Sequence, residues 1–155
     1  MNIYLKNGED DWIYHENISE KELLNRNISI GSYASIESGA RIGSGARIGS
    51  DARIGSDASI ESGAMIGSDA MIGSGARIGS GTTLNGKTDI IVISPIGSRN
   101  SALTGYIKEG KLVISTGCFL GTEDEFIEKL KITHGDNEHS VKYKSAIEFM
   151  NKILK

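Results

Sequence analysis

The C-terminal part of the chain carries polar and reactive side chains whose types could do chemistry. The candidates are Arg99, Thr104, Tyr106, Cys118, His134, His139 and Tyr143. A cysteine and a histidine can form a thiol nucleophile and its base, and one cysteine with two histidines could contribute to a zinc site. Arg99 could instead bind the anionic group of a small ligand while Tyr106 or Tyr143 stacks on its ring.

A structural role is the alternative for the same residues. Cys118, next to Phe119, fits a small buried hydrophobic side chain, and the two histidines fit the ends of helices. One cysteine and two histidines do not complete a structural zinc site, and their spacing matches no standard zinc finger. We therefore expect no metal and no cofactor, assign no catalytic residue, and predict that the seven candidates bind a small anion.

A second set of candidates for anion binding lies in the middle of the chain. It consists of Arg41, Arg47, Arg53 and Arg77. Guanidinium groups bind phosphate and carboxylate through two parallel hydrogen bonds. The alternative is that these arginines pair with Glu37 or Glu61 between subunits and aid solubility.

The four arginines lie in a stretch, from Ile30 to about Ser98, in which every sixth residue is a branched aliphatic. The unit reads Ile-Gly-Ser-(Gly/Asp)-Ala-x. A period of six with Gly-Ser in most units is incompatible with a helix. It predicts very short strands, with alanine and isoleucine inward and glycine or aspartate at corners of unusual backbone angle. Three sides make one coil.

This stretch resembles the hexapeptide-repeat family, whose fold is the left-handed parallel β-helix. The resemblance implies a mainly β protein of about four coils with a cap at each end. Most members are acyltransferases that work as trimers, with a histidine projecting from the coils as general base and a long loop that closes over the substrates. The three histidines of this chain, His15, His134 and His139, lie outside the coils, and no loop interrupts the repeats. Both absences argue against acetyl transfer.

Residues eighteen positions apart are predicted to stack on one face, roughly 4.8 Å per coil. The outward columns are Arg41, Ser59, Arg77 and Pro95; Arg47, Met65 and Thr83; and Ser35, Arg53, Met71 and Asp89. Two corner columns are Gly45, Gly63 and Gly81, and Tyr33, Asp51, Asp69 and Lys87. Outward methionines at 65 and 71 favour a subunit interface, and hence a homotrimer.

Three segments are expected along the chain. Residues 1–29 form an N-terminal cap, with strands at 3–5 and 12–14, a turn at 7–10 and a short helix after the capping box that begins at Ser19. Residues 30–98 form the β-helix. Residues 99–155 form a β-β-α-α cap, with a hairpin over 102–116 and helices that begin after Thr122 and after Asn137.

The C-terminal segment also carries a resemblance. Its motifs are Pro95-Ile96-Gly97-Ser98-Arg99, Thr104-Gly105-Tyr106, Ser115-Thr116-Gly117-Cys118-Phe119 and Thr133-His134-Gly135-Asp136-Asn137-Glu138-His139. They are similar to a module that follows β-helical repeats in uncharacterised phage and prophage proteins, often labelled transferases. The resemblance implies a phage or prophage origin and brings no known active site.

Composition excludes several classes of function. The net charge is −3, and the sequence predicts no basic face for binding duplex nucleic acid. No apolar run is long enough for a membrane span. The single cysteine cannot form an internal disulfide. We expect a cytoplasmic protein, in the host cytoplasm if it is phage-encoded.

The sequence therefore predicts a non-enzymatic, trimeric β-helix that captures a small anionic, nucleotide-like ligand or docks a host protein. An acyl-coenzyme-A-dependent acyltransferase and a structural spacer are the alternatives.

Overall fold

The computed structural model describes residues 2–6, 11–86 and 89–154. The chain divides into two compact units, residues 1–87 and 88–155, named the repeat unit and the C-terminal unit. None of the helices in the described residues is long and apolar enough to cross a membrane.

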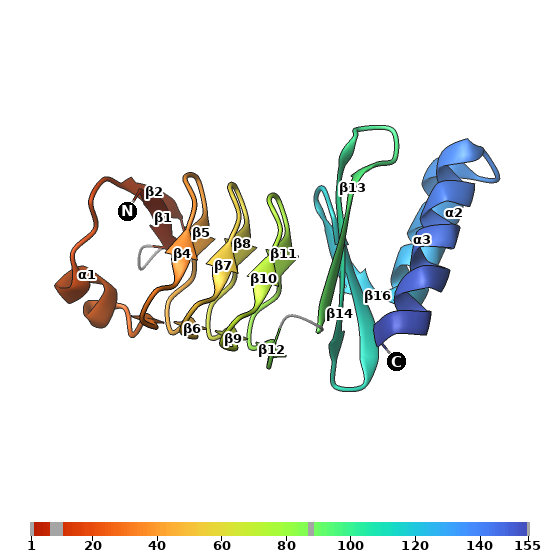
Figure 1. Cartoon of the computed structure of the whole chain (residues 1–155). Helices are drawn as coiled ribbons and strands as arrows, with labels where there is room; N and C mark the ends of the chain where they lie inside the picture. Colours follow the sequence, from red (N-terminus) through yellow and green to blue (C-terminus); the bar gives the residue numbers. More distant parts are fainter. Residues whose placement is uncertain (1, 7–10, 87–88, 155) are drawn as a thin grey trace. The chain divides into compact units, whose positions relative to one another are not determined.

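The repeat unit is built from two-residue strands stacked in coils (Figure 1). In chain order they are β3 (Ser29–Ile30), β4 (Ser35–Ile36), β5 (Arg41–Ile42), β6 (Arg47–Ile48), β7 (Arg53–Ile54), β8 (Ser59–Ile60), β9 (Met65–Ile66), β10 (Met71–Ile72), β11 (Arg77–Ile78) and β12 (Thr83–Leu84). Each side of the coil is a parallel sheet: β3-β6-β9-β12, β4-β7-β10 and β5-β8-β11. This arrangement confirms the predicted parallel β-helix; its left hand stays a prediction from the family resemblance.

The hexad pattern places its residues as predicted. Ala52 and Ile54 are 0% and 1% exposed, whereas Arg53 between them points outward and is exposed. Asp51 and Asp69 take the corner positions with φ of 59° and 61°. Alternation along each short strand thus fills the interior of the coil, and the corner residues supply the left-handed backbone between strands.

The β-helix has about three turns, not about four. Ile90 and Ile96 keep the six-residue spacing but lie in β13 (Ile90–Ile96), a strand of the C-terminal unit. Between these two residues the sequence has consecutive β-branched side chains and no Gly-Ser corner, which favours one longer strand. Asp89 and Pro95 were therefore wrongly assigned to the outward columns of the coil.

The remaining column assignments are confirmed by strand register. Ser59 pairs with Arg41 on one side and Arg77 on the other. The second column pairs Arg47 with Met65 and Met65 with Thr83, and the third pairs Ser35 with Arg53 and Arg53 with Met71. The corner glycines Gly45, Gly63 and Gly81 all have positive φ. Lys87, the expected end of the other corner column, lies outside the described residues.

The N-terminal segment extends one sheet of the coil. β1 (Ile3–Lys6) pairs antiparallel with β2 (Trp12–His15) and parallel with β5, with Leu5 beside Ile42. The expected turn at 7–10 lies outside the described residues. The short helix is confirmed as α1 (Glu20–Asn25), with Ser19 at the N-cap and Glu22 completing the capping box.

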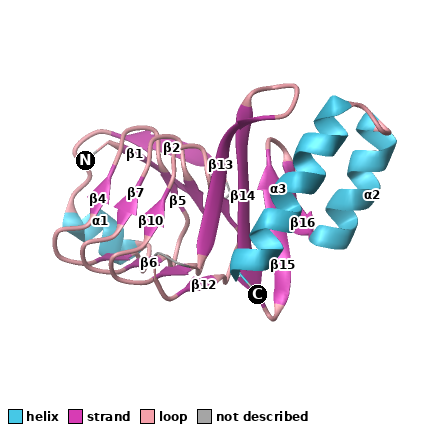
Figure 2. Ribbon diagram, turned by 45° about the vertical axis from the view of Figure 1, so that its right-hand side comes forward, coloured by secondary structure: helices cyan, strands magenta, loops and turns pink. Residues whose placement is uncertain are grey.

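The C-terminal unit is an antiparallel sheet covered on one face by two helices (Figure 2). After β13 come β14 (Ser101–Lys108), β15 (Lys111–Thr116), β16 (Phe119–Thr122), α2 (Glu123–His134) and α3 (Glu138–Leu154). The sheet order follows the chain, β13-β14-β15-β16. Both predicted helices are confirmed, and Thr122 and Glu125 form the expected capping box.

One strand of this sheet was missed. β16 follows a two-residue turn at Gly117 and Cys118, where Gly117 has φ 53°. The strand is only four residues long and contains a glycine, so it lacks the alternating pattern that reveals longer strands. The core of the unit gathers Leu103, Ile114, Phe126, Ile147 and Met150 between sheet and helices. The three-part division of the chain at 29 and 98 stays a prediction.

Candidate functional site

A cavity of about 200 Å³ lies in the C-terminal unit where two strand turns meet the joint between the helices. Ser98 and Arg99 come from the β13–β14 turn, and Gly117 and Cys118 from the β15–β16 turn. The strands and helices contribute the other lining residues, Ser101, Thr116, Phe119, Thr133, His134 and Tyr143. We name this space the polar cavity, because a charged group and several hydroxyl groups line it.

A second cavity of about 120 Å³ shares part of the same wall. The shared residues are Thr116, Phe119, Thr133, His134 and Tyr143. The walls that belong to it alone come from α2: Phe126, Lys129 and Leu130. We name it the aromatic cavity.

A chain of ring contacts runs along the shared wall. The centroid distances are 5.1 Å for Phe119–Phe126, 5.4 Å for Phe126–Tyr143, 6.2 Å for Tyr143–His134 and 5.6 Å for His134–His139. The Phe126 and Tyr143 planes meet at 78°, the edge-to-face arrangement that aromatic pairs favour. These contacts join rings from β16, α2 and α3 beside the two cavities.

A glycine fixes the position of Tyr143. Gly97 has φ 71°, and a Cβ there would collide with the Tyr143 hydroxyl oxygen and ring. The turn before Arg99 can therefore lie against the tyrosine only because residue 97 has no side chain. Tyr143 itself is 7% exposed and belongs to the core of the unit.

The polar cavity also holds a pair of hydroxyl groups. Ser101 Oγ on β14 and Thr116 Oγ1 on β15 lie 3.5 Å apart, and either can donate to the other. Arg99 is exposed and Cys118 is an exposed free cysteine. The exposure of Cys118 contradicts the alternative considered from the sequence, a small buried hydrophobic side chain.

The structure brings together four of the seven C-terminal candidates. Arg99, Cys118, His134 and Tyr143 line the polar cavity. His139 reaches it only through its ring contact with His134, and its Nε2 lies 3.9 Å from Glu138 Oε1.

Two candidates lie elsewhere. Thr104 and Tyr106 are 1% and 0% exposed. They alternate along β14 with Leu103 and Gly105, which face the helices, so they point to the other face of the sheet. Neither lines the cavities.

Other cavity residues were not found from the sequence. The most informative are Ser98, Ser101, Phe119, Phe126, Lys129 and Thr133. Phe126, Lys129, Leu130 and Thr133 follow three-and-four spacing on α2, so one helix face carries them. The spacing can be read from the sequence, but no local pattern indicates that this helix face packs beside the strand turns.

Comparison with known families identifies the repeats. Residues 51–86 match the family model described as bacterial transferase hexapeptide (six repeats). The match falls within the stacked parallel strands of the repeat unit. The repeats of this chain are therefore hexapeptide repeats, and they form a parallel β-helix. No curated protein and no solved structure matches it.

The four arginines of this hexapeptide-repeat β-helix do not converge within one chain. Arg41 and Arg77 lie on the sheet that contains β1, whereas Arg47 and Arg53 lie on the other two sheets. Arg41 and Arg77 each have a contact: Arg41 lies over the Tyr4 ring at 5.6 Å, and Arg77 Nη2 lies 3.5 Å from Glu61 Oε1.

Glu61 joins two cations on the outer face of that sheet. Its side chain is 10% exposed, and its Oε2 lies 3.2 Å from Lys6 Nζ. A Cβ at Gly43, which lies between these two residues in the strand register, would collide with the backbone at Glu61 and Ser62. One of the predicted arginine–glutamate pairs thus forms within a single chain, and Glu37 instead accepts hydrogen bonds from Ser56.

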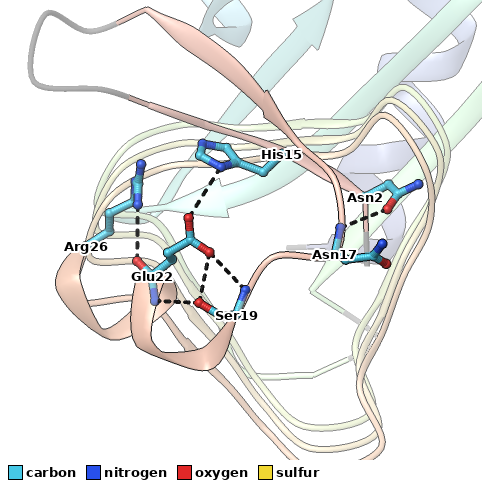
Figure 3. Close-up of polar contacts among 6 residues, drawn as sticks. All are labelled: Asn2, His15, Asn17, Ser19, Glu22 and Arg26. Carbon is cyan, nitrogen blue, oxygen red and sulfur yellow. Dashed lines mark hydrogen bonds and ion pairs between the residues drawn. The ribbon is translucent and has the colours of Figure 1, made fainter.

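The repeat unit has one histidine, in a polar cluster at β2 and α1 (Figure 3). His15 Nδ1 lies 3.9 Å from Glu22 Oε1, and its Nε2 is buried without a hydrogen-bond partner among the described residues. Hydrogen bonds from the backbone N–H and then the side chain of Ser19 lower the pKa of Glu22, and the charges of His15 and Arg26 add to this. The cluster caps a helix, and its imidazole nitrogen is closed to solvent.

In the part of the chain that the structure describes, no group of three or more His, Cys, Asp and Glu side chains could hold a metal ion. Cys118, His134 and His139, considered above for zinc, are among these residues.

Proposed function

We propose that this hexapeptide-repeat protein is a binding protein that captures a small anionic ligand in the C-terminal unit. One observation carries the proposal: Arg99, Cys118, His134 and Tyr143, from two turns and two helices, line one cavity. A guanidinium beside hydroxyl groups favours an anion through charge-assisted hydrogen bonds. The aromatic wall suits a flat group attached to that anion.

In this proposal the β-helix is a scaffold that joins three chains. Met65 and Met71 are 41% and 57% exposed on neighbouring sheets of the coil. Exposed methionines on flat sheet faces favour an interface. We place the assembly in the cytoplasm, because an exposed free cysteine persists in a reducing compartment.

The experiment is native mass spectrometry of the full chain purified gently from cells. We expect a small acidic molecule to be retained. Arg99→Gln should abolish retention, because it removes the charge and leaves an exposed turn otherwise intact. The matched control is Arg53→Gln, an exposed arginine on the coil, which should retain the molecule.

Two outcomes would contradict the proposal. Loss of the molecule in Arg53→Gln but not in Arg99→Gln would move the anion site to the coil surface. Absence of any retained acidic molecule, together with no binding of the anions tested below, would leave a scaffold without this ligand site.

An acyl-coenzyme-A-dependent acyltransferase is the second candidate, favoured by the family description that residues 51–86 match. This reaction needs a general base within reach of the acceptor. No histidine lies between Ile30 and Leu84, and His15 has a buried Nε2. Acetyl-coenzyme A turnover by the full chain, lost in His15→Gln, would replace our proposal with this one.

A further inference from the structure

The two cavities of the C-terminal unit differ in chemistry from one end to the other. The residues that line only the polar cavity include Ser98, Arg99, Ser101 and Cys118. The residues that line only the aromatic cavity are Phe126, Leu130 and Lys129. A ligand that occupies both must therefore have an anionic end and an apolar end.

The volumes limit the size of that ligand. The cavities measure about 200 and 120 Å³, whereas pockets for drug-sized ligands are about 300–1,000 Å³. Each cavity alone is smaller than that range, and the two together reach only its lower end. A small ligand, such as one ring with one charged substituent, fits this space.

The anionic end is defined by donors from one turn and two strands. Arg99 supplies the positive charge, and the Ser101 and Thr116 hydroxyl groups lie side by side at 3.5 Å. Carboxylates and phosphates both accept hydrogen bonds from such groups. The geometry specifies an oxyanion without choosing between the two.

The apolar end is defined by rings. Phe119, Phe126 and Tyr143 contact one another at 5.1 and 5.4 Å with planes tilted by 57° and 78°. All three rings line the aromatic cavity. A flat aromatic guest gains stacked or edge-to-face contacts with such rings, beyond the apolar burial that a puckered ring also obtains.

We infer that the ligand is a single aromatic ring bearing one carboxylate or phosphate group, with the anion at Arg99 and the ring among Phe119, Phe126 and Tyr143. The inference rests on the proposed capture of an anion in the same site. It narrows the expected nucleotide-like ligand to a smaller class.

The test is calorimetric titration of the full chain with benzoate, cyclohexanecarboxylate, phenyl phosphate, cyclohexyl phosphate, inorganic phosphate and adenosine monophosphate. We expect benzoate or phenyl phosphate to bind. For the better of the two, the non-aromatic counterpart (cyclohexanecarboxylate or cyclohexyl phosphate) should bind about 3- to 10-fold more weakly, which is the scale of an aromatic contact.

Variants then assign each end of the ligand. Arg99→Gln should weaken binding about 10-fold or more, the scale of a charge-assisted hydrogen bond. Phe119→Leu should weaken the aromatic probe about 3-fold or more without affecting inorganic phosphate. The matched control for the latter is Phe149→Leu, because Phe149 is 50% exposed on α3 and lines neither cavity.

The relative affinities of benzoate and phenyl phosphate show whether the site prefers a carboxylate or a phosphate group. Equal binding of the aromatic probe and its non-aromatic counterpart would overturn the inference about the ring. Binding of adenosine monophosphate that depends on Arg99, with no binding of the single-ring probes, would also overturn it while the proposed capture of an anion stands. If no probe binds in an Arg99-dependent way and the purified protein retains no acidic molecule, the proposed function itself is wrong.

Discussion

Single residues determine where chemistry can occur in this protein. Arg99 and Cys118 lie in exposed turns, so their side chains are available to a ligand. Tyr143 is 7% exposed and is held by core contacts. The site thus combines accessible polar groups with a fixed ring, the combination that lets a ligand bind without ordering the protein first.

Gly97 controls this arrangement, and its substitution is the first prediction. In Gly97→Ala the methyl group would collide with Tyr143 and would also have to adopt a φ of 71°. We expect the free energy of unfolding to fall by about 2–4 kcal/mol, the sum of a backbone cost of about 1 kcal/mol and the displacement of a packed ring. Urea unfolding followed by circular dichroism measures it.

Gly110→Ala is the matched control for that substitution. Gly110 lies in the same unit with φ 74°, and a Cβ there meets no atom within 4 Å. It should show the backbone cost alone, about 1 kcal/mol. Equal losses in the two variants would mean that the contact between residue 97 and Tyr143 contributes nothing to stability.

At the scale of elements, local signals predicted the structure well where neighbours in sequence are neighbours in space. The capping boxes at Ser19 and Thr122 need only residues three positions apart. The hexads need only a corner and a two-residue strand, so their columns could be derived by counting. Counting hexads therefore assigned three coils correctly. It also assigned Ile90 and Ile96 to a further coil, although both lie in β13.

Contacts between distant segments could not be predicted in this way. Lys6 meets Glu61 because β1 pairs with β5, a pairing that no local pattern indicates. The cavity likewise depends on β16 and on the packing of α2 beside two strand turns. The candidate residues were chosen from the sequence by chemical type. Thr104 and Tyr106 do not line the cavity, because their side chains point to the face of the sheet away from the helices.

The start of α2 gives a prediction for pH dependence. Hydrogen bonds from the Thr122 backbone N–H, and then from its hydroxyl, lower the pKa of Glu125 below its ordinary value of 4.5. A carboxyl group whose pKa is lower in the folded protein than in the unfolded chain stabilises the fold at pH values above its unfolded-state pKa. This stabilisation is lost as the pH falls through the pKa of the folded state. Stability should therefore decrease below about pH 4.5.

Glu125→Gln isolates that effect. Glutamine can keep the reciprocal hydrogen bond of the capping box but has no charge to lose. We expect the drop in urea midpoint between pH 7 and pH 3 to be smaller than in the parent chain. Thr122→Ser keeps the cap hydroxyl and should retain the full drop. A drop of the same size in Glu125→Gln and the parent chain would rule out this carboxyl as a source of the acid sensitivity.

At the scale of the whole molecule, the two units have different roles in the proposed function. The three parallel sheets of the repeat unit repeat the same short strand, and only the outward side chains differ from coil to coil. The C-terminal unit offers concave space and a mixture of charged, hydroxyl and aromatic side chains. Assembly is therefore expected from the first unit and ligand specificity from the second.

The last prediction tests assembly through the methionine faces. In the double variant Met65→Lys and Met71→Lys, two positive charges would have to lose water on forming an interface, which is unfavourable without a paired anion. Native mass spectrometry should show trimers of the 16.6 kDa parent chain and mainly monomers of the variant. Ile132→Lys is the control, since Ile132 is 81% exposed on α2 in the other unit, and it should remain trimeric. Trimers that persist in the double variant would place the interface away from these faces, and a parent chain that is monomeric would reject the proposed assembly altogether.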